Sequence, residues 1–170
     1  VIVLNLKELF NDNPIFDNFI DEVLPIENIT SDDGEPQIFG YLEISSINVQ
    51  QYVLAGTNEN TLKLGPGHYT STALPGTGGN VGIAGHRTTY GAPFGDLDAV
   101  NIGDTVLLTV DSKIFHYQVD SIDVVEAVGG EYVLFDRGDD RLTLTTCHPK
   151  YSAKERLIVS GILTKIEAIN

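Results

Sequence analysis

Short runs of alternating apolar and polar residues, separated by turns, dominate the chain after residue 37. In residues 114–119 and 142–147, about every second side chain is apolar. This period of two is typical of a β-strand that buries one face. Because the runs are short and the turns between them are rich in glycine, the pattern favours an all-β (mainly β) domain over a helical bundle.

The pattern predicts about eight strands, at residues 39–44, 47–54, 80–86, 105–110, 114–119, 122–125, 142–147 and 156–163. Short helical segments are predicted at residues 58–64 and 93–100, the second opened by a proline. Strands of this length and spacing are typical of a closed barrel or a sandwich. A chain of 170 residues, 42% of them hydrophobic, is large enough for one such domain with its own core.

Residues 1–37 follow a different pattern. They contain nine acidic side chains and one lysine, and their apolar residues recur at helical spacing between Pro14 and Pro25. Turn-forming residues follow at 30–36. We therefore expect residues 1–37 to form a helical appendage and linker, which packs on the domain or joins it to an upstream anchor. Residues 38–170 are expected to form the β-domain.

The formal net charge of the chain is −14. So acidic a surface repels nucleic acid and anionic lipid headgroups, so neither is an expected partner. No stretch of the sequence is both apolar and long enough to span a bilayer.

Cys147 is the only cysteine, and it ends the strand predicted at residues 142–147. A lone cysteine forms no disulfide within its own chain, and a strand end holds a side chain in a fixed direction, as a thiol nucleophile requires. The alternative is a small buried hydrophobic residue, which is the usual state of a free cysteine. The polar residues expected beside Cys147 favour the nucleophile.

His86 and Arg156 are those residues. His86 ends the strand predicted at residues 80–86, and Arg156 follows Cys147 by nine positions, a spacing that lets the chain return beside the thiol. A neighbouring histidine raises the thiolate fraction of a cysteine or carries protons. An arginine stays charged and donates hydrogen bonds to an oxyanion, and one such donor lowers a barrier by about 3–4 kcal/mol. The three residues therefore predict acyl transfer.

The same residues carry a family resemblance. Thr143-Leu-Thr-Thr-Cys147 resembles the TLxTC strand of the sortase family of cysteine transpeptidases, and His86 and Arg156 stand in the family's order. Residues 85–94, Gly-His-Arg-Thr-Thr-Tyr-Gly-Ala-Pro-Phe, and residues 146–159 resemble class E sortases most closely. The resemblance covers about residues 38–166.

The resemblance implies an eight-stranded β-barrel with Cys147 as the nucleophile and His86 as the general acid and base. It implies that Arg156 stabilises the oxyanion and helps to hold the substrate. Thr146 stands at the family position thought to assist at the oxyanion, and Thr145 is expected to bind substrate beside it.

Sortases cleave an LPxTG-type sorting signal between Thr and Gly, and class E members are associated with LAxTG. They form a thioacyl enzyme, which an amine, usually of a peptidoglycan precursor, resolves into a new amide. The resemblance therefore implies secreted proteins with a C-terminal sorting signal as partners. It also implies a location at the outer face of the plasma membrane of a Gram-positive cell, behind an N-terminal anchor upstream of the chain.

Two further histidines are weaker candidates for the substrate-binding site. His68 lies in a glycine-rich segment that also resembles class E sortases, which predicts a place at the edge of the pocket. His148 follows Cys147 directly, so strand alternation turns it away from the thiol, to act as a wall residue, a solvated residue or a substrate contact. The spacing of these residues matches no zinc site or EF-hand, so neither metal nor cofactor is predicted.

Leu74-Pro-Gly-Thr-Gly78 matches the LPxTG signal within the chain itself. The favoured interpretation is a turn, since proline and glycine have the required backbone preferences. The alternative is a pseudosubstrate that visits its own or a neighbour's active site.

Three rival functions stay open. A non-catalytic barrel would only bind sorting-signal peptides, and a cysteine peptidase would hydrolyse the acyl enzyme, an outcome that depends on how well water is excluded. A pilin-polymerising sortase typically carries an N-terminal lid with an Asp-Pro-Trp motif. This chain has no tryptophan, and Asp12-Asn-Pro14 is a poor substitute.

Overall fold

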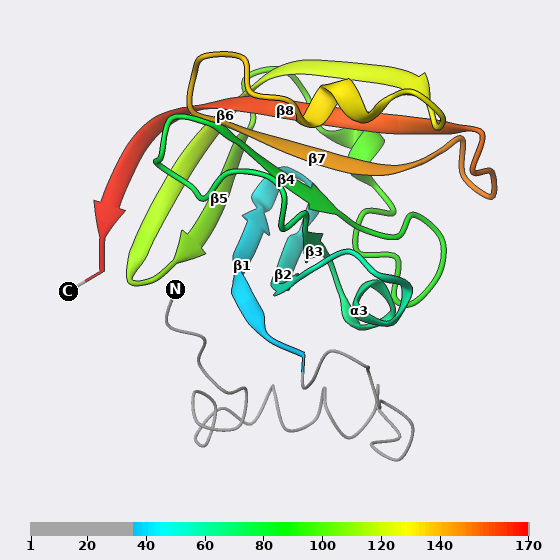
Figure 1. The fold of residues 1–170 in the computed structure, drawn as a ribbon, viewed down its shortest axis with the longest axis horizontal. Helices are drawn as coiled ribbons and strands as arrows, with labels where there is room; N and C mark the ends of the chain where they lie inside the picture. The colour runs from blue at the N-terminus through cyan, green and yellow to red at the C-terminus, as the bar shows by residue number, and fades with distance from the viewer. Residues whose placement is uncertain (1–35, 170) are drawn as a thin grey trace.

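The computed structural model describes residues 36–169, which form a closed barrel of eight strands (Figure 1). The strands are β1 (Ile38–Ile44), β2 (Val49–Ala55), β3 (Gly67–His68), β4 (Asn80–Ala84), β5 (Thr105–Val110), β6 (Lys113–Glu126), β7 (Arg141–His148) and β8 (Glu155–Ala168). Their order around the barrel is β1-β2-β3-β4-β7-β8-β6-β5. The all-β prediction is confirmed, and the barrel, not the sandwich, is the form observed.

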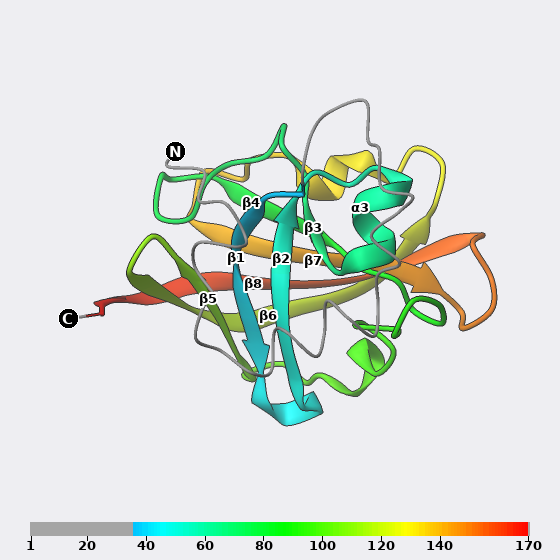
Figure 2. The same cartoon turned by 90° about the horizontal axis from the view of Figure 1, so that it is seen from below.

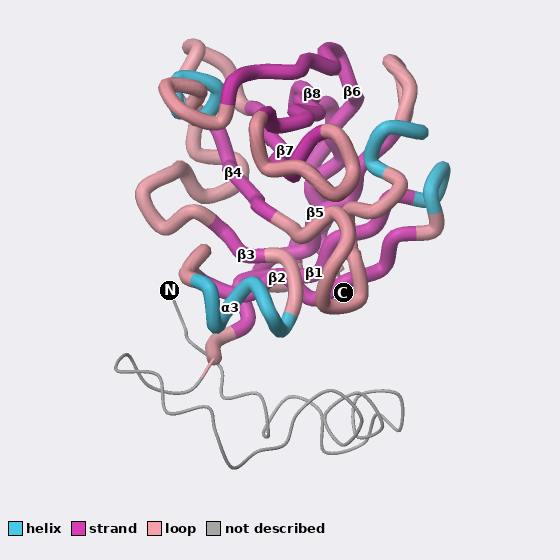
Figure 3. The backbone as a smooth tube through the Cα atoms, turned by 90° about the vertical axis from the view of Figure 1, so that its right-hand side faces the viewer, coloured by secondary structure: helices cyan, strands magenta, loops and turns pink. Residues whose placement is uncertain are grey.

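Short helices fill four connections between the strands, and Figure 3 shows them at the periphery of the barrel. They are η2 (Ser45–Ile47), α3 (Glu59–Leu64), η3 (Leu97–Ala99) and η4 (Glu131–Leu134). Asn58 caps α3, its side chain accepting from Thr61 N at 2.9 Å. The helix predicted at residues 58–64 is therefore confirmed.

Of residues 1–37, only the last two are described, so the predicted appendage lies outside the described residues. The barrel begins where the alternating pattern begins, with β1 at Ile38. In the part of the chain that the structure describes, no helix has the length and apolar character needed to cross a membrane.

β7 carries Cys147 and lies between β4 and β8 in the barrel. It runs parallel to β4 on one side and antiparallel to β8 on the other. Seen from below, β1 and β2 cross the direction of β7 and β8 steeply (Figure 2). The parallel β4–β7 pair brings together two strand ends that point the same way, and these ends carry His86 and Cys147.

Alternating side chains of the strands fill the barrel. From β7 and β8, Leu142, Leu144, Leu157 and Val159 point inward and are at most 3% exposed. Burial of each such side chain contributes about 1.5–3 kcal/mol of hydrophobic free energy. The odd-numbered residues of β7, Cys147 among them, therefore face the outside of the barrel wall.

Three predicted elements differ from those observed. β3 was not predicted, because its two residues join the sheet through backbone pairing and leave no side-chain pattern. The strands predicted at 114–119 and 122–125 are one strand, β6, whose register shifts between Val119 and Ser121. In residues 93–100 only η3 is helical, although Phe94 and Leu97, three residues apart, are both buried in the core.

The Leu74–Gly78 segment forms a closed turn. Thr77 Oγ1 donates to Leu74 O at 2.7 Å, and Gly78 N donates to the Asp140 carboxylate at 2.6 Å. Gly76 has a positive φ of 75°, and a side chain there would meet the ring of Phe115. Asp140 directly precedes β7, so the turn is fastened to the end of that strand opposite Cys147.

Candidate active site

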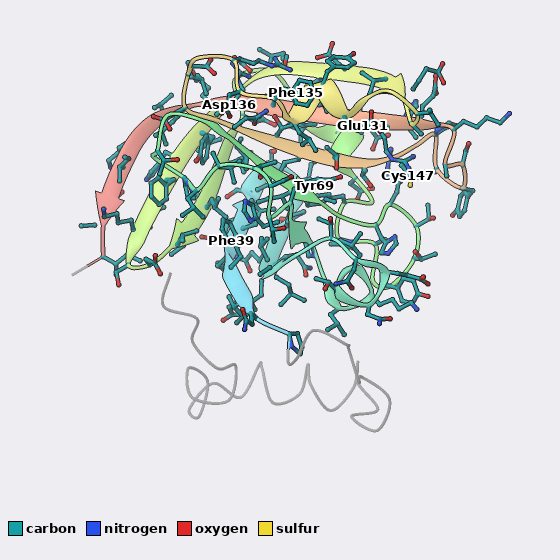
Figure 4. The ribbon with its side chains drawn as sticks, viewed as in Figure 1. Phe39, Tyr69, Glu131, Phe135, Asp136 and Cys147 are labelled. Carbon is teal, nitrogen blue, oxygen red and sulfur yellow. The ribbon has the colours of Figure 1, made fainter. Side chains whose placement is uncertain are left out.

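Cys147 lies next to the end of β7, where the buried strand reaches the surface. The six residues from Arg141 to Thr146 are all buried, whereas Cys147 is partly exposed and its thiol is free. Figure 4 shows it at the end of β7 that adjoins the β7–β8 turn. The strand therefore fixes the direction of the thiol, and the end of the strand exposes it.

Arg156 pairs with Cys147 across the antiparallel β7–β8 ladder. Directly opposite residues project to the same face of a sheet, so the guanidinium and the thiol share the outer face. Arg156 Nη1 donates to the carbonyls of Ala153 at 2.9 Å and Glu155 at 3.0 Å. Its Nε and Nη2 have no hydrogen-bond acceptor among the described residues, so they are available to a bound group.

His86 follows β4 by two residues. The last β4–β7 pair is Ala84 with Thr145, and Gly85 N donates to Thr145 O at 3.1 Å. Continuing this parallel register brings His86 level with Cys147. Residue 85 must be a glycine for Phe94 to pack against the chain here, because a Cβ at this position would lie 2.6 Å from the ring of Phe94.

The environment of the His86 imidazole favours its neutral form. Burial lowers the pKa of His86 below its usual value, and the carboxylate of Glu59 on α3 opposes that effect. Nε2 is buried and has no hydrogen-bond partner among the described residues. The Tyr90 ring lies 5.2 Å from the imidazole, centroid to centroid. A neutral imidazole with an unpartnered nitrogen can accept and return a proton.

The two threonines before Cys147 join β7 to the chain that precedes His86. Thr146 Oγ1 donates to Gly85 O at 2.7 Å, and Thr145 Oγ1 lies 3.0 Å from the Tyr69 hydroxyl. Both threonines are at most 5% exposed. The proton of the Thr146 hydroxyl is therefore used within the protein.

The structure brings His148 close to the site and gives His68 a different setting. His148 pairs with Glu155, on the face opposite Cys147, and its Nδ1 is buried without a hydrogen-bond partner among the described residues. His68 is 4% exposed within β3 and stacks on Phe39 at 3.9 Å. The structure therefore brings Cys147, Arg156 and His86 together, with His148 on the reverse of the same strand end.

His68 holds the loop that follows it. Its Nε2 lies 3.1 Å from Ala73 O and 3.1 Å from Thr72 Oγ1. Since a carbonyl only accepts, the Ala73 bond requires the proton on Nε2. Thr72 Oγ1 in turn accepts from Gly82 N of β4 at 3.0 Å. His68 therefore fixes the loop that begins with Tyr69 against β4.

Arg87, which no sequence motif assigned a role, is 3% exposed and contacts the backbone of Cys147. The only available signal was its position directly after His86. Tyr69 was also missed, because its partner Thr145 lies 76 residues away in the sequence. Among the described residues, no three His, Cys, Asp or Glu side chains lie together as a metal site would require.

A partly exposed thiol, a neutral imidazole and a guanidinium with free donors thus lie on adjoining strand ends. Such a set can form and break an acyl–sulfur bond, because the thiol attacks, the imidazole moves protons and the guanidinium donates to the oxyanion.

Comparisons with known proteins agree with this chemistry. The family described as "Sortase domain" matches residues 42–164. Sortase SrtE1 of Streptomyces coelicolor is 34% identical over 140 residues, which cover 74% of this chain and 40% of that protein. The structure of sortase E from Streptomyces avermitilis superposes with a TM-score of 0.70 at 34% identity, covering 77% of this chain and 90% of that chain. Sortase C of Streptococcus pneumoniae, whose structure is described in terms of pilin substrate specificity, superposes with a TM-score of 0.70 at 35% identity, over 75% and 67% of the two chains.

Proposed function

The chain belongs to the sortase family, and from this membership we propose that it is a cysteine transpeptidase. Its substrates are proposed to be secreted proteins with a C-terminal LPxTG- or LAxTG-type sorting signal. The observation that carries the proposal is the Cys147–Arg156 pair on β7 and β8, with His86 brought alongside by β4.

In the proposed acylation, neutral His86 takes the proton of the Cys147 thiol, and the resulting thiolate attacks the threonine carbonyl of the Thr–Gly bond. Negative charge moves to the carbonyl oxygen, where Arg156 Nε and Nη2 donate hydrogen bonds. Protonated His86 gives its proton to the glycine nitrogen as the C–N bond breaks. A thioacyl enzyme and a free amino group result, with His86 neutral.

In the proposed second step, an amine attacks the thioester carbonyl. Neutral His86 accepts the proton that the amine loses, the C–S bond breaks, and sulfur leaves as the thiolate. The product is a new amide, and His86 returns its proton to the thiolate, which restores the thiol and the neutral imidazole. We propose a peptidoglycan precursor as the amine, and the outer face of the plasma membrane as the place of reaction.

The remaining predicted residues are proposed to shape the site. Thr146 fixes the strand beside the oxyanion through its bond to Gly85, and Thr145 presents its hydroxyl with Tyr69 to the substrate. His148 lines the reverse of the strand end. His68 acts from a distance, by holding the loop that begins with Tyr69 at the pocket edge.

Polymerisation of pilins is a second candidate function. The similarity to the pneumococcal sortase C, whose description concerns pilin substrates, favours it. The two functions differ in the amine that resolves the thioacyl enzyme, since a pilin lysine would replace the wall precursor.

Mass spectrometry of wild type and Cys147→Ala, each mixed with LAxTG and LPxTG peptides and an amine, tests the proposal. We expect a peptide–amine conjugate from wild type alone. Peptide cleaved only to the free acid would indicate a hydrolase, and unchanged peptides in both samples would favour the non-catalytic binding module. Glycine-based amines and a pilin-type lysine peptide, supplied in competition, distinguish the two transfer reactions.

A further inference from the structure

Arg87 is a buried cation placed directly after His86. Its side chain is 2% exposed, and it has three recorded partners. Nε donates to Gly95 O at 3.0 Å, Nη1 donates to Cys147 O at 3.2 Å, and Nη2 pairs with the Asp98 carboxylate at 2.9 Å. Every nitrogen of the guanidinium is therefore used inside the protein.

These contacts connect the chain around His86 to the nucleophile. Phe94 N donates to His86 O at 3.1 Å, so the segment from His86 to Gly95 closes into a loop around the Arg87 side chain. Arg87 ties that loop to the backbone carbonyl of Cys147 itself. On the other side of His86, Gly85 is tied to Thr146. His86 is thus held between two contacts, each of which reaches the β7 strand at or beside the thiol.

Folding alone does not explain an arginine at this position. Burial removes the charge of the guanidinium from water while its partner Asp98 stays 53% exposed, and an apolar residue of similar volume often stabilises a fold equally well or better. An arginine has a planar guanidinium that donates hydrogen bonds to several acceptors at fixed angles. Neither a lysine nor an apolar side chain can make the same set of bonds. Two of the three acceptors, Gly95 O and Cys147 O, belong to the two segments whose separation the proposed reaction requires to be constant.

We infer that Arg87 is a positioning residue of the reaction, which sets the separation and orientation of His86 and Cys147 through the Cys147 carbonyl. The inference rests on the proposed function. Arg87 does not touch the reacting atoms, and it acts through the backbone of the nucleophile. Since a misplacement of about 1 Å costs roughly 100-fold in rate, loosening this contact is expected to lower kcat much more than it changes KM.

Arg141, in the strand that carries Cys147, provides a matched control for Arg87. It is also buried, at 6% exposed, and its guanidinium is tied to Asp120, Asp139 and Ser160. It lies six residues from Cys147, which is about 20 Å along an extended strand. Arg141→Lys removes a buried guanidinium from one end of β7, and Arg87→Lys removes the buried guanidinium that contacts the other end.

The test compares these two variants with wild type in three measurements: thermal unfolding, steady-state transfer of a sorting-signal peptide to an amine, and alkylation of Cys147 by iodoacetamide across pH. Kinetics are measured well below the lowest melting temperature.

For Arg87→Lys we expect kcat to fall at least 10-fold with KM within about threefold, and the alkylation profile to change shape or midpoint. For Arg141→Lys we expect an equal or larger fall in Tm, with kcat within twofold and the wild-type alkylation profile.

Asp98→Asn separates the ion pair from the contact with Cys147. It breaks the same 2.9 Å pair but leaves the bonds of Arg87 to Gly95 and Cys147 in place. We expect kcat within threefold of wild type for this variant. A kcat that follows the loss in Tm across all three variants, or an Arg87→Lys enzyme within twofold of wild type, overturns the inference.

Alkylation needs no peptide, so the inference can fail separately from the proposed function. A wild type that turns over no peptide contradicts the proposed function alone. Identical alkylation profiles for wild type and Arg87→Lys contradict the positioning role alone.

Discussion

The two ends of β7 differ in the hydrogen bonding of their side chains, although both are polar and both involve a buried arginine, Arg141 in the strand itself and Arg87 beside Cys147. At the Arg141 end, the guanidinium bonds to Asp139, Asp120 and Ser160, and Thr143 donates to Asn80. At the Cys147 end, His86 Nε2 and His148 Nδ1 are buried without partners among the described residues.

This difference indicates which end of the strand stabilises the fold and which end reacts. A buried polar group without a hydrogen bond costs about 1–3 kcal/mol. Of the four such side-chain atoms among the described residues, those of His86 and His148 lie beside the thiol, and those of Tyr117 and Ser121 lie on β6. A saturated network leaves no donor for a substrate. The Arg141 end of β7, here called its base, is therefore fully hydrogen-bonded, whereas the Cys147 end, here called its tip, has unpartnered groups beside it. The following variants test that division.

Removal of the thiol has the largest expected effect on activity and the smallest on stability. Cys147→Ala should abolish transfer by at least about 10³-fold, because no other nucleophile is present at the tip. Its Tm should stay within about 2 °C of wild type, since Cys147 is partly exposed and leaves no large cavity. Transfer assays and thermal melts measure the two effects. Residual transfer above 1% of wild type would contradict the assignment of the nucleophile.

Loss of the guanidinium opposite the thiol should follow in size. Arg156→Ala is expected to lower kcat by about 10²–10³-fold, the usual effect of losing an oxyanion donor. Arg137→Ala is the control, because Arg137 is exposed and stands in the loop before β7. Steady-state kinetics at matched peptide concentrations measure both. Equal kcat values in the two variants would remove Arg156 from the chemistry.

The base of the strand should show the reverse pattern. Asn80 donates to Val133 O at 2.9 Å and accepts from Thr143 Oγ1 at 2.8 Å, and it is fully buried. Asn80→Ala leaves these groups unpaired and should lower the free energy of unfolding by about 2–4 kcal/mol. Per folded molecule, kcat should stay within about threefold of wild type.

Asn101→Ala serves as the control for this prediction, since Asn101 is exposed and bonds to Ala99 O on the surface. It should change the unfolding free energy by less than about 0.5 kcal/mol. Urea denaturation of both variants measures the difference. A loss of activity without a loss of stability in Asn80→Ala would abolish the contrast between the two ends.

The sequence predicted the tip of β7 better than its base. Alternation located β7, β8 and β4, and the motif around Cys147 predicted the family that the sortase-domain match confirms. The cross-strand pairing of Arg156 with Cys147 followed from loop length alone. The specific roles assigned to Thr145, Thr146, His68 and His148 remain predictions.

What the sequence did not predict depends on contacts between distant residues. Nothing in the order of residues indicates that Asn80 bonds to the η4 segment or that Arg87 reaches Cys147 O across 60 positions. β3 was missed for a related reason, because two residues paired through their backbones carry no periodicity. The predicted number of eight strands was still right, because the missed strand β3 was balanced by β6, which was predicted as two strands.

A smaller effect is expected from His68, whose burial lowers its pKa below 6.5, against the opposing bond to Ala73 O. The unfolded chain then binds the proton more readily than the folded one, so stability is full above pH 6.5 and falls as pH decreases through the lower folded pKa. His68→Gln should make the unfolding free energy flatter between pH 7.5 and 5. Urea titrations across this range measure the slope, and parallel slopes for both proteins would contradict the prediction.

The last prediction is that the enzyme does not cleave its own Leu74–Gly78 turn. The Thr77 and Gly78 bonds close this segment, and Pro75 is buried. Its anchor Asp140 lies seven residues before Cys147, which is about 23 Å along β7, so the turn cannot enter the site of its own chain without unfolding.

A five-residue match to the proposed signal should therefore stay uncut. On long incubation of wild type, mass spectrometry should find no fragment ending at Thr77. A free peptide containing Leu74-Pro-Gly-Thr-Gly78 should be cleaved by the same sample, because in the peptide nothing holds the turn closed. Cleavage of the folded chain in wild type but not in Cys147→Ala would show that the base of β7 opens far more readily than its saturated hydrogen bonds imply. An uncut chain beside a cut peptide would show that the fold, and not the sequence, protects this signal.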